Sequence, residues 1–329
     1  MNFKNIVGQS QILNNLNLNI QNKKINHANL FIGEEGIGKK TLAIEYAKII
    51  LCNDMTNCGK CISCKTFKTE TNPDYKFVKS DKKTIGVDIV RNIQNDISIM
   101  PVYGNYKVYI FTNIHLMTIQ AQNALLKTLE EPPEYVVLIL TSPNLNQILD
   151  TVISRSIIFN FKKNTKEDVE LYIKENYTIG IEQREFAVKI ADGIIGKAKK
   201  VLENENFLDI RNNVIEFIRF IINKDYNKTI NIYEFFNSNK DNIDDIFLVM
   251  NLFYRDILVY LKTKNEKILI NSDKKDIIID IFSKVSSFKI ENDIKFINDA
   301  RRKINTNVNF QLVIEVMLLK LQEEIIKNG

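Results

Sequence analysis

A glycine-rich stretch near the N-terminus has the spacing of a loop that holds phosphate groups. It reads GEEGIGK over residues 33–39 and directly follows the apolar run Leu30-Phe31-Ile32. Glycines let backbone N–H groups turn inward around phosphate oxygens, the final lysine reaches the terminal phosphates, and the N-terminus of the following helix adds its dipole. The residues predicted to form this phosphate-binding loop are Gly33, Gly36, Gly38, Lys39, Lys40 and Thr41.

Two positions where phosphoryl transfer needs a metal ligand or a base carry other residues. Lys40 stands where a Ser or Thr would bind Mg²⁺, and Thr41 comes one residue too late for that role. The apolar run 108–111 should end on an aspartate for Mg²⁺ and a glutamate that activates water, but Thr112 and Asn113 follow it. Neither neutral side chain replaces a carboxylate. We predict a site that can bind ATP or ADP without hydrolysing it; the alternative is a loop kept only as a strand-to-helix turn.

The four cysteines form a second chemical cluster. They are Cys52, Cys58, Cys61 and Cys64. Two C-x-x-C steps after a five-residue gap can place four thiolates tetrahedrally around Zn²⁺, and in a cytoplasmic protein such crowding argues against disulfides. Four sulfur ligands leave no position for a catalytic water, so we predict a structural metal. The alternative is a redox pair or free thiols.

Nucleophilic catalysis of the hydrolase kind is not indicated. The two histidines, His27 and His115, lie far apart in the sequence and have no ligand-like spacing around them. No Ser-His-Asp or Cys-His arrangement is suggested. We expect both histidines to be structural or surface groups.

A strand–helix–strand unit must position the residues that follow the run 108–111. That run is continuous and apolar, as expected of a strand buried on both faces of a parallel sheet. Ala121, Leu125 and Leu129 then recur at helical spacing, and Pro132-Pro133 ends the predicted helix. Residues 136–140 have the composition of the next buried strand. The sequence therefore predicts an α/β fold with a parallel sheet.

Composition changes near residue 200. At 329 residues the chain exceeds what one core usually fills, so two or three domains are expected. All five prolines lie at or before Pro143, and the only glycine after Gly196 is Gly329. A long span without either residue predicts a wholly helical second half.

Amphipathic segments fill this second half, at 214–222, 243–261, 276–285, 293–304 and 312–326. They predict an all-helical bundle. In the last segment Leu312, Val316, Leu319 and Ile326 fall on one side, which is most simply a core-facing side.

Charge and hydropathy exclude a membrane protein. No run of about 18 apolar residues appears and the N-terminus is polar, so we expect a cytoplasmic protein. The formal net charge of +5 is small for the length. It permits contact with nucleic acid without indicating it, and no run of alternating basic and aromatic residues is evident.

The stretch NALLKTLEEPP at 123–133 closely resembles a signature of the clamp-loader branch of the AAA+ ATPases. The loop at 33–39 and the phrase IGVDIVR at 85–91 resemble the same family. The resemblance covers roughly the first 200 residues with specific motifs and the remainder by domain order. It implies an AAA+ phosphate-loop domain over 1–162 with a zinc module inserted at 52–64, a helical lid over 163–206, and an all-α collar domain over 207–329.

The segment 163–206 fits such a lid. Thr165 and Asp168 have the spacing of a capping box, and Asp192-Gly193 and Gly196 interrupt the helical pattern. In active AAA+ members an arginine near such a break contacts the nucleotide, and residues 196–198 offer no equivalent. The resemblance therefore implies a third missing part of the ATPase site.

Residues Ile153-Ser154-Arg155-Ser156 resemble the clamp-loader S-R-C motif, with Ser156 in place of the cysteine. In that family the arginine reaches into the nucleotide site of a neighbouring subunit and stabilises charge on the transferring phosphoryl group, as an arginine finger in trans. The resemblance thus implies that Arg155 is catalytic in another subunit. The alternative is an arginine that pairs locally at a strand edge.

The function implied by the resemblance is that of a largely non-hydrolysing clamp-loader subunit of a replicative DNA polymerase holoenzyme, which helps to load the sliding clamp on primed DNA. The implied partners are the other loader subunits (delta and gamma/tau) in a hetero-pentamer, the sliding clamp and primer-template DNA, with no membrane. Two alternatives stay open. One is a self-sufficient ATPase, either the motor subunit of the same machine or another AAA+ remodeller. The other is a zinc-stabilised DNA-binding scaffold in repair.

Overall fold

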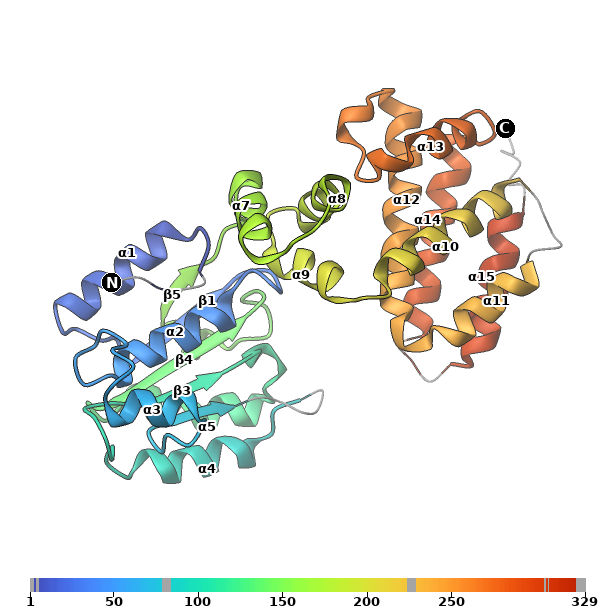
Figure 1. The fold of residues 1–329 in the computed structure, drawn as a ribbon. Helices are drawn as coiled ribbons and strands as arrows, with labels where there is room; N and C mark the ends of the chain where they lie inside the picture. Colours follow the sequence, from blue (N-terminus) through green and yellow to red (C-terminus); the bar gives the residue numbers. More distant parts are fainter. Residues whose placement is uncertain are drawn as a thin grey trace. The chain divides into compact units, whose positions relative to one another are not determined.

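The computed structural model of the chain describes residues 3, 6–78, 84–223, 229–304, 306 and 308–323. It divides into two compact units (Figure 1). The first unit runs to Tyr177 and includes Ala191–Lys197, and the second holds Thr178–Ile190 and the chain from Ala198 onward. The predicted division into three domains, with boundaries at 162 and 206, stays a prediction.

The first unit is built on a parallel sheet with the strand order β2-β3-β4-β1-β5. Its strands are β1 (Ala28–Ile32), β2 (Tyr75–Val78), β3 (Lys107–Phe111), β4 (Val136–Ser142) and β5 (Ile157–Asn160). Every pairing in the sheet is parallel. The predicted parallel α/β fold is confirmed, and the carboxyl ends of all these strands lie along one edge.

Side chains alternate between two cores on opposite faces of the sheet. On β3, Val108 and Ile110 join one core, while Tyr109 and Phe111 join the other. Helices α1 (Ser10–Gln21) and α2 (Lys39–Leu51) cover the first face, and α4 (Val87–Ile97) and α5 (Ile119–Glu130) cover the second (Figure 1). Burial on both faces explains why the strands are apolar throughout.

Shorter elements complete this part of the chain. They are α3 (Ile62–Lys68), η1 (Ile114–Leu116), α6 (Asp150–Ile153), α7 (Lys166–Asn176), α8 (Ile181–Ala191) and α9 (Ile195–Glu203). At the start of α7, Thr165 Oγ1 accepts a hydrogen bond from the backbone N–H of Asp168 at 3.1 Å, and the Asp168 carboxylate accepts one from Thr165 N–H at 3.3 Å. The predicted capping box is confirmed.

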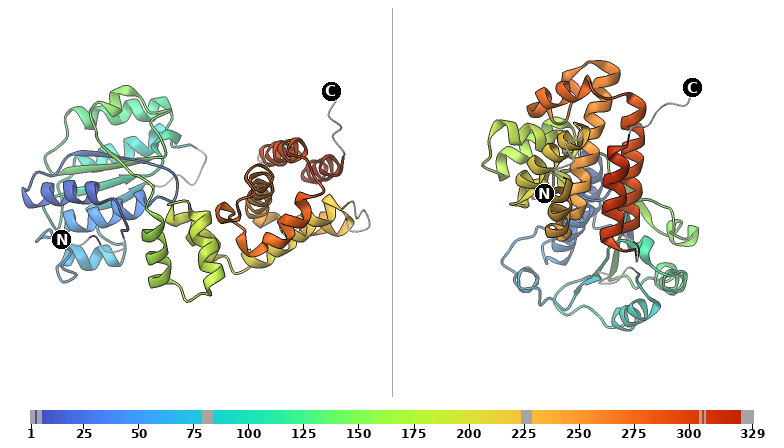
Figure 2. Two further views of the ribbon diagram at one scale, coloured as in Figure 1. Left: turned by 90° about the horizontal axis from the view of Figure 1, so that it is seen from above. Right: turned by 90° about the vertical axis from the view of Figure 1, so that its right-hand side faces the viewer.

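Helices alone form the rest of the described second unit (Figure 2). They are α10 (Phe207–Ile222), α11 (Thr229–Ser238), η3 (Lys240–Asn242), α12 (Ile243–Thr263), η4 (Glu266–Ile268), η5 (Ser272–Lys274), α13 (Lys275–Phe282), α14 (Ser287–Ile304) and α15 (Phe310–Gln322). The predicted helical second half is confirmed. Among the described residues, no helix has the length and hydrophobicity needed to cross a bilayer.

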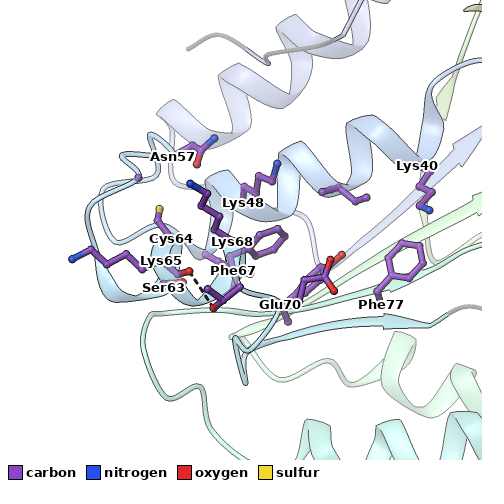
Figure 3. A pocket seen from close by; sticks show the side chains of 15 residues that line it. Lys40, Lys48, Asn57, Ser63, Cys64, Lys65, Phe67, Lys68, Glu70 and Phe77 are labelled. Carbon is purple, nitrogen blue, oxygen red and sulfur yellow. Dashed lines mark hydrogen bonds between the residues drawn. The ribbon is translucent and has the colours of Figure 1, made fainter. Parts of the chain in front are cut away.

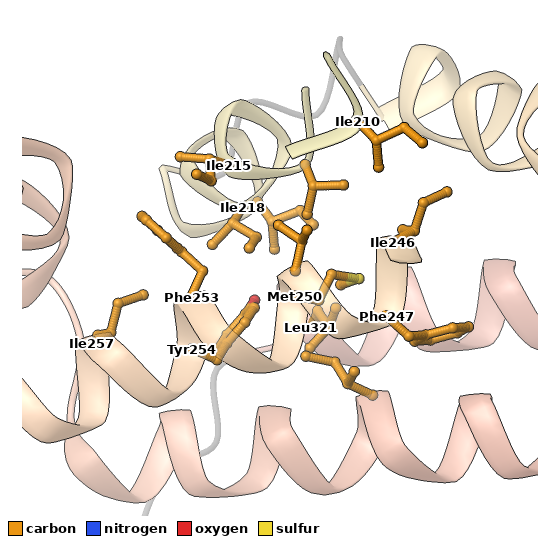
Figure 4. Packing of buried hydrophobic residues seen from close by; sticks show 14 of the residues in the cluster. Ile210, Ile215, Ile218, Ile246, Phe247, Met250, Phe253, Tyr254, Ile257 and Leu321 are labelled. Carbon is orange, nitrogen blue, oxygen red and sulfur yellow. The ribbon is translucent and has the colours of Figure 1, made fainter. Parts of the chain in front are cut away.

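The core of this bundle lies between α10, α12 and α15. Ile218, Phe253 and Leu321 are each at most 2% exposed and pack together with the aromatic ring of Tyr254 (Figure 4). Burial of one such large apolar side chain contributes about 1.5–3 kcal/mol. The second half of the chain is therefore held by a continuous core of its own.

The predicted core-facing side of the last helix is wrong. Leu312, Val316 and Leu319 are 57%, 37% and 60% exposed, and Ile326 lies outside the described residues. The core residues of α15 are instead Val313, Ile314, Met317, Leu318 and Leu321. Apolar residues surround most of this helix, so spacing alone could not tell which side the bundle would cover.

A buried polar network ties α10 to the segment before α13. Arg211, only 4% exposed, donates to both carboxylate oxygens of Asp273 at 2.7 and 2.9 Å and to Asn271 Oδ1 at 2.8 and 3.1 Å. Its guanidinium lies 4.0 Å from the ring centroid of Phe186. Burial would raise the pKa of Asp273, but the hydrogen bonds and charge of Arg211 hold it below its usual range. The network satisfies an otherwise costly buried cation.

We predict that Arg211→Met lowers the free energy of unfolding of the second unit by about 3–5 kcal/mol, because it leaves buried partners without their cation. The control Arg219→Met removes a side chain that is 45% exposed and should change stability by less than about 0.5 kcal/mol. Urea denaturation followed by circular dichroism measures both.

The effect of Arg211→Met should also depend on pH. Because the pKa of Asp273 is lower in the folded state, its ionised carboxylate contributes to the free energy of unfolding above the ordinary carboxyl pKa of about 4. This contribution is lost as the pH falls through the lower folded-state pKa. The difference between wild type and variant should therefore shrink in acid. Equal stability of the two proteins at pH 7 would contradict the prediction.

Candidate functional site

The phosphate loop lies at the strand edge where β1, β4 and β3 end side by side. Gly33 N–H donates to the Ser142 carbonyl at 3.2 Å, and Asn113 N–H donates to Thr141 Oγ1 at 3.2 Å. These bonds connect the tip of β4 to the tips of its two neighbours. The phosphate loop and the predicted strand tip at Asn113 thus both border β4 at one edge of the sheet, although Gly33 and Asn113 are 80 positions apart in the chain.

The glycines of the loop adopt backbone angles that other residues rarely reach. Gly36 and Gly38 have φ angles of +82° and +108°, and Gly38 directly precedes α2. The Gly36 carbonyl accepts a hydrogen bond from Gly196 N–H at 3.0 Å. A Cβ atom added to Gly196 would lie 2.6 Å from Gly36 Cα. The phosphate loop is therefore supported by the start of α9, at a distance that only glycine permits.

The loop lysine contacts its own loop in this structure. Lys39 is 7% exposed, and its ammonium donates to the carbonyls of Gly33 and Glu34 at 2.5 and 2.9 Å. Burial lowers the pKa of Lys39 to about 8, against the opposing charges of Glu35 and Glu34. The ammonium is thus satisfied without an anion, and a phosphate would have to replace these carbonyl contacts.

Other side chains stand where ATP hydrolysis needs a hydroxyl ligand for Mg²⁺ and two carboxylates. Lys40 extends toward β2, with Nζ 5.0 Å from the ring centroid of Phe77, and Thr41 is exposed. Thr112 Oγ1 donates to the Val78 carbonyl at 3.3 Å, and Asn113 takes a left-handed conformation with φ 56°. None of these side chains can supply a carboxylate for Mg²⁺ or for water activation.

His115 also lies at this site, although its spacing in the sequence did not indicate it. It lies in η1, just past the tip of β3, with Nδ1 3.5 Å from Ser142 Oγ. Burial lowers the pKa of His115, and the positive charge of Lys39 lowers it further. Its position two residues after Asn113 was the available signal, but only the η1 turn brings the ring back toward the loop.

The four cysteines gather between the end of α2 and the start of α3. Their sulfur atoms all lie within 4.8 Å of one another, with 4.0 Å between those of Cys58 and Cys64. Tetrahedral thiolates around Zn²⁺, with bonds of about 2.3 Å, would be about 3.8 Å apart. All four thiols are free. The cluster can therefore hold a metal ion with four sulfur ligands.

Backbone donors also point at these sulfur atoms. The sulfur of Cys58 accepts from the backbone N–H groups of Lys60 and Cys61. The sulfur of Cys52 accepts from the N–H of Cys58, and that of Cys61 accepts from the N–H of Cys64. The nitrogen-to-sulfur distance is 3.4 Å in every case. Gly59 makes the turn with φ +69°. Such donors stabilise negatively charged sulfur, which is the form that binds a metal.

Arg155 lies between α6 and β5 and is partly exposed. Its Nη2 is 2.9 Å from Glu130 Oε1, and its Nη1 donates to the Thr151 carbonyl at 3.1 Å. The side chains of Arg155 and Glu130 are 37% and 48% exposed. An ion pair in such a position contributes at most about 1 kcal/mol, so little free energy holds the arginine in place.

Family models match both parts of the chain. One described as "DNA polymerase III, delta subunit" matches residues 8–165, and one described as "DNA polymerase III, delta subunit, C terminal" matches residues 205–323. Together with the parallel sheet and its phosphate loop, these matches define the class of protein. The chain belongs to the DNA polymerase III delta-subunit family, within the clamp-loader AAA+ proteins.

Curated relatives carry the names of several subunits. The tau subunit of Bacillus subtilis is 36% identical over 51% of this chain and 30% of its own length. The gamma/tau subunit of Mycoplasma genitalium is 29% identical over 83% of this chain and 50% of its own length. The delta' subunit of Bacillus subtilis is 25% identical over 96% of both chains. The chain therefore spans half or less of the first two relatives and nearly all of the third.

A solved structure agrees in fold. The gamma subunit-related protein of DNA polymerase III from Thermotoga maritima superposes with a TM-score of 0.54 at 17% identity, over 93% of this chain and 98% of its own. At this identity the likeness concerns the fold alone.

We predict that Gly196→Ala destabilises the first unit by about 1–3 kcal/mol, although alanine is usually favoured over glycine in a helix. The added Cβ would meet the Gly36 backbone, which cannot move without distorting the phosphate loop. Gly180→Ala is the control, since a Cβ there meets nothing within 4 Å. Thermal unfolding measures both variants; a stabilised Gly196→Ala protein would refute the contact.

Proposed function

We propose that the chain is a delta prime-type subunit of a bacterial DNA polymerase III clamp loader. In this role it hydrolyses little or no ATP itself, helps to load the sliding clamp on primed DNA, and supplies Arg155 to the ATPase site of a neighbouring subunit. The observation that carries the proposal is the set of side chains around the phosphate loop. Lys40, Thr112 and Asn113 stand where Mg²⁺-assisted hydrolysis needs a hydroxyl and two carboxylates.

The rate factors of the missing groups support very slow ATP hydrolysis by the chain itself. Loss of a general base alone costs about 10²–10⁴ in rate, and loss of the metal ligand removes further charge stabilisation. Nucleotide binding needs neither group, because the backbone N–H groups of the loop and Lys39 contact phosphate directly. The phosphate loop is therefore suited to holding ATP or ADP as a fixed part of the subunit.

The surroundings of Arg155 support a role in trans. Its planar fork suits phosphate oxygens, and its only ion pair among the described residues is the weak, exposed one with Glu130. A neighbouring nucleotide could therefore draw the side chain away at little cost. An arginine finger contributes about 10³–10⁵ in rate to the site that it completes.

Partners are expected along the second unit. The exposed residues Leu312, Val316 and Leu319 give α15 an apolar outer side, which suits contact between subunits in a collar. The proposed assembly is a hetero-pentamer with delta and gamma/tau subunits, acting on the sliding clamp and primer-template DNA within the polymerase holoenzyme. The delta' relative, which matches over 96% of its length, supports this assignment.

A structural Zn²⁺ completes the proposal. The four cysteine sulfurs form a closed ligand set of the kind that Zn²⁺ favours, with no open coordination position. When bound, the ion supplies cross-linking and no reaction chemistry. Because α3 has only seven residues and one buried side chain, metal ligation would hold the module more strongly than its own packing.

The second candidate is an ATP-hydrolysing motor subunit of the same complex. It is favoured by the names of the tau and gamma/tau relatives, of which the first shares 36% identity. It requires turnover by the isolated chain, so one measurement separates the two candidates.

We predict that the purified chain hydrolyses negligible ATP with Mg²⁺ present. The variant Arg155→Ala is then tested in an assembly reconstituted with motor subunits, clamp and primed DNA. Hydrolysis at the one nucleotide site that Arg155 completes should slow by about 10³-fold or more. The stimulated ATPase activity of the assembly should therefore lose the share that this site contributes. Phosphate release measures both reactions.

Three control variants accompany this ATPase test. Arg155→Lys keeps the charge but not the fork and should remain impaired. Glu130→Ala frees the arginine and should retain activity. Arg91→Ala removes an arginine whose side chain is 67% exposed and should also retain activity. Motor-like turnover by the isolated chain, or full activity of the Arg155→Ala assembly, would refute the first candidate.

We also predict one tightly bound zinc per chain by metal analysis. Cys61→Ser should release the metal and lower the melting temperature of the first unit, because three sulfurs bind Zn²⁺ more weakly. Lys60→Ala, which keeps its backbone N–H donor to Cys58, should retain the metal. Preparations without metal in the wild type, or with full metal in Cys61→Ser, would count against the site.

A further inference from the structure

A recess on the first unit lies between the cysteine cluster and the edge strand of the sheet (Figure 3). Helices α2 and α3 and strand β2 form its walls, and its volume is about 1060 Å³. Pockets of about 300–1,000 Å³ hold drug-sized ligands, so this recess has room for a ligand of at least that size. Apart from Lys40, which follows the phosphate loop, none of its lining residues belongs to the proposed nucleotide site or to the proposed role of Arg155.

Positive charge dominates the lining. Lys40, Lys48, Lys65 and Lys68 line the recess together with the acidic residue Glu70. Lys48 is paired with Glu45 at 2.7 Å. The other three lysines have no ion pair within the part of the chain that the structure describes. An anionic ligand would therefore find cations that are not already neutralised.

Aromatic rings lie beside these charges. The rings of Phe67 and Tyr75 approach with centroids 4.4 Å apart, and Phe77 follows on the same strand as Tyr75. Lys40 Nζ stands 5.0 Å from the Phe77 centroid, and Lys48 Nζ stands 5.9 Å from that of Phe67. If phosphate groups drew these two ammonium groups away from the rings, the ring faces would become available for other contacts.

We propose that this recess binds a short stretch of single-stranded nucleic acid. Phosphates would contact the lysines, and bases would stack on Phe67, Tyr75 and Phe77. A basic groove with aromatic platforms is the general means of holding single strands without sequence preference. Rings and lysines in this arrangement favour nucleic acid over an acidic peptide, because carboxylates would engage the lysines and leave the flat ring faces without stacking partners.

The proposal gives Lys40 a role of its own. At the position where a metal ligand would stand, the chain instead extends an ammonium group toward Phe77. The lysines and aromatic rings of the recess come from α2, α3 and β2, which explains why no continuous basic-aromatic run marks them in the sequence.

The test is fluorescence anisotropy of a labelled oligothymidylate of about ten nucleotides, within the site sizes known for single-strand grooves. The protein is the full-length chain with its metal content verified, in buffer without nucleotide, and salt is varied. The double variant Lys65→Ala, Lys68→Ala should weaken binding and reduce the slope of log K against log salt by about 1.4, since each phosphate contact contributes about 0.7. Phe67→Leu keeps an apolar side chain and should weaken binding about fivefold or more.

The matched control is Lys166→Ala, Lys174→Ala, which removes the same charge from exposed positions of α7. It should leave both affinity and salt slope nearly unchanged. The proposal would be overturned if the two double variants had equal effects, if Phe67→Leu left binding unaltered, or if the wild type did not bind at low salt. Displacement of the oligonucleotide by polyglutamate, with no effect of Phe67→Leu, would assign the recess to an acidic peptide and also overturn it. None of these outcomes depends on ATPase activity in an assembly, so they are independent of the proposed loader function.

Discussion

Parallel pairing of β4 with β1 on one side and β3 on the other is the constraint on which the site depends. It brings the tips of three strands to one edge, where hydrogen bonds join Gly33 to Ser142 and Asn113 to Thr141. Such pairing requires each strand to be covered on both faces, which α1, α2, α4 and α5 achieve. A phosphate loop can then be held rigidly whether or not the groups around it support hydrolysis.

Around this loop, Lys40 stands where an ATPase has a hydroxyl, and the neutral residues Thr112 and Asn113 stand where it has two carboxylates. Lys39 is satisfied by its own loop, and Lys40 turns to the ring of Phe77. The site therefore keeps the geometry for holding phosphate and lacks the oxygen ligands for metal and water. Arg155, by contrast, has only weak local contacts. A chain of this kind fits a division of labour in which one subunit contributes structure and a cation to a reaction that another performs.

The cysteine module and the edge strand enclose a region that neither would form alone. α3 packs the ring of Phe67 against Tyr75 of β2, and the sulfur of Cys61 caps the start of α3 by accepting the backbone N–H of Cys64. The polar network of Arg211 has a comparable place in the second unit, since it joins segments that are 62 positions apart through buried hydrogen bonds. In both units, a few polar or sulfur groups decide how elements meet, and apolar burial supplies most of the stabilisation.

Local patterns determined the strands, the helical second half, the capping box of Thr165 and the composition of the phosphate loop, because short-range backbone preferences and hydrophobic spacing govern these features. The clustering of the cysteines followed from their spacing alone. Only the tertiary structure decided which side of α15 is covered, that His115 turns back to the loop, that Gly196 supports Gly36, and that lysines and rings from three elements share one recess. These outcomes depend on contacts between residues far apart in the chain, which periodicity within one element cannot specify.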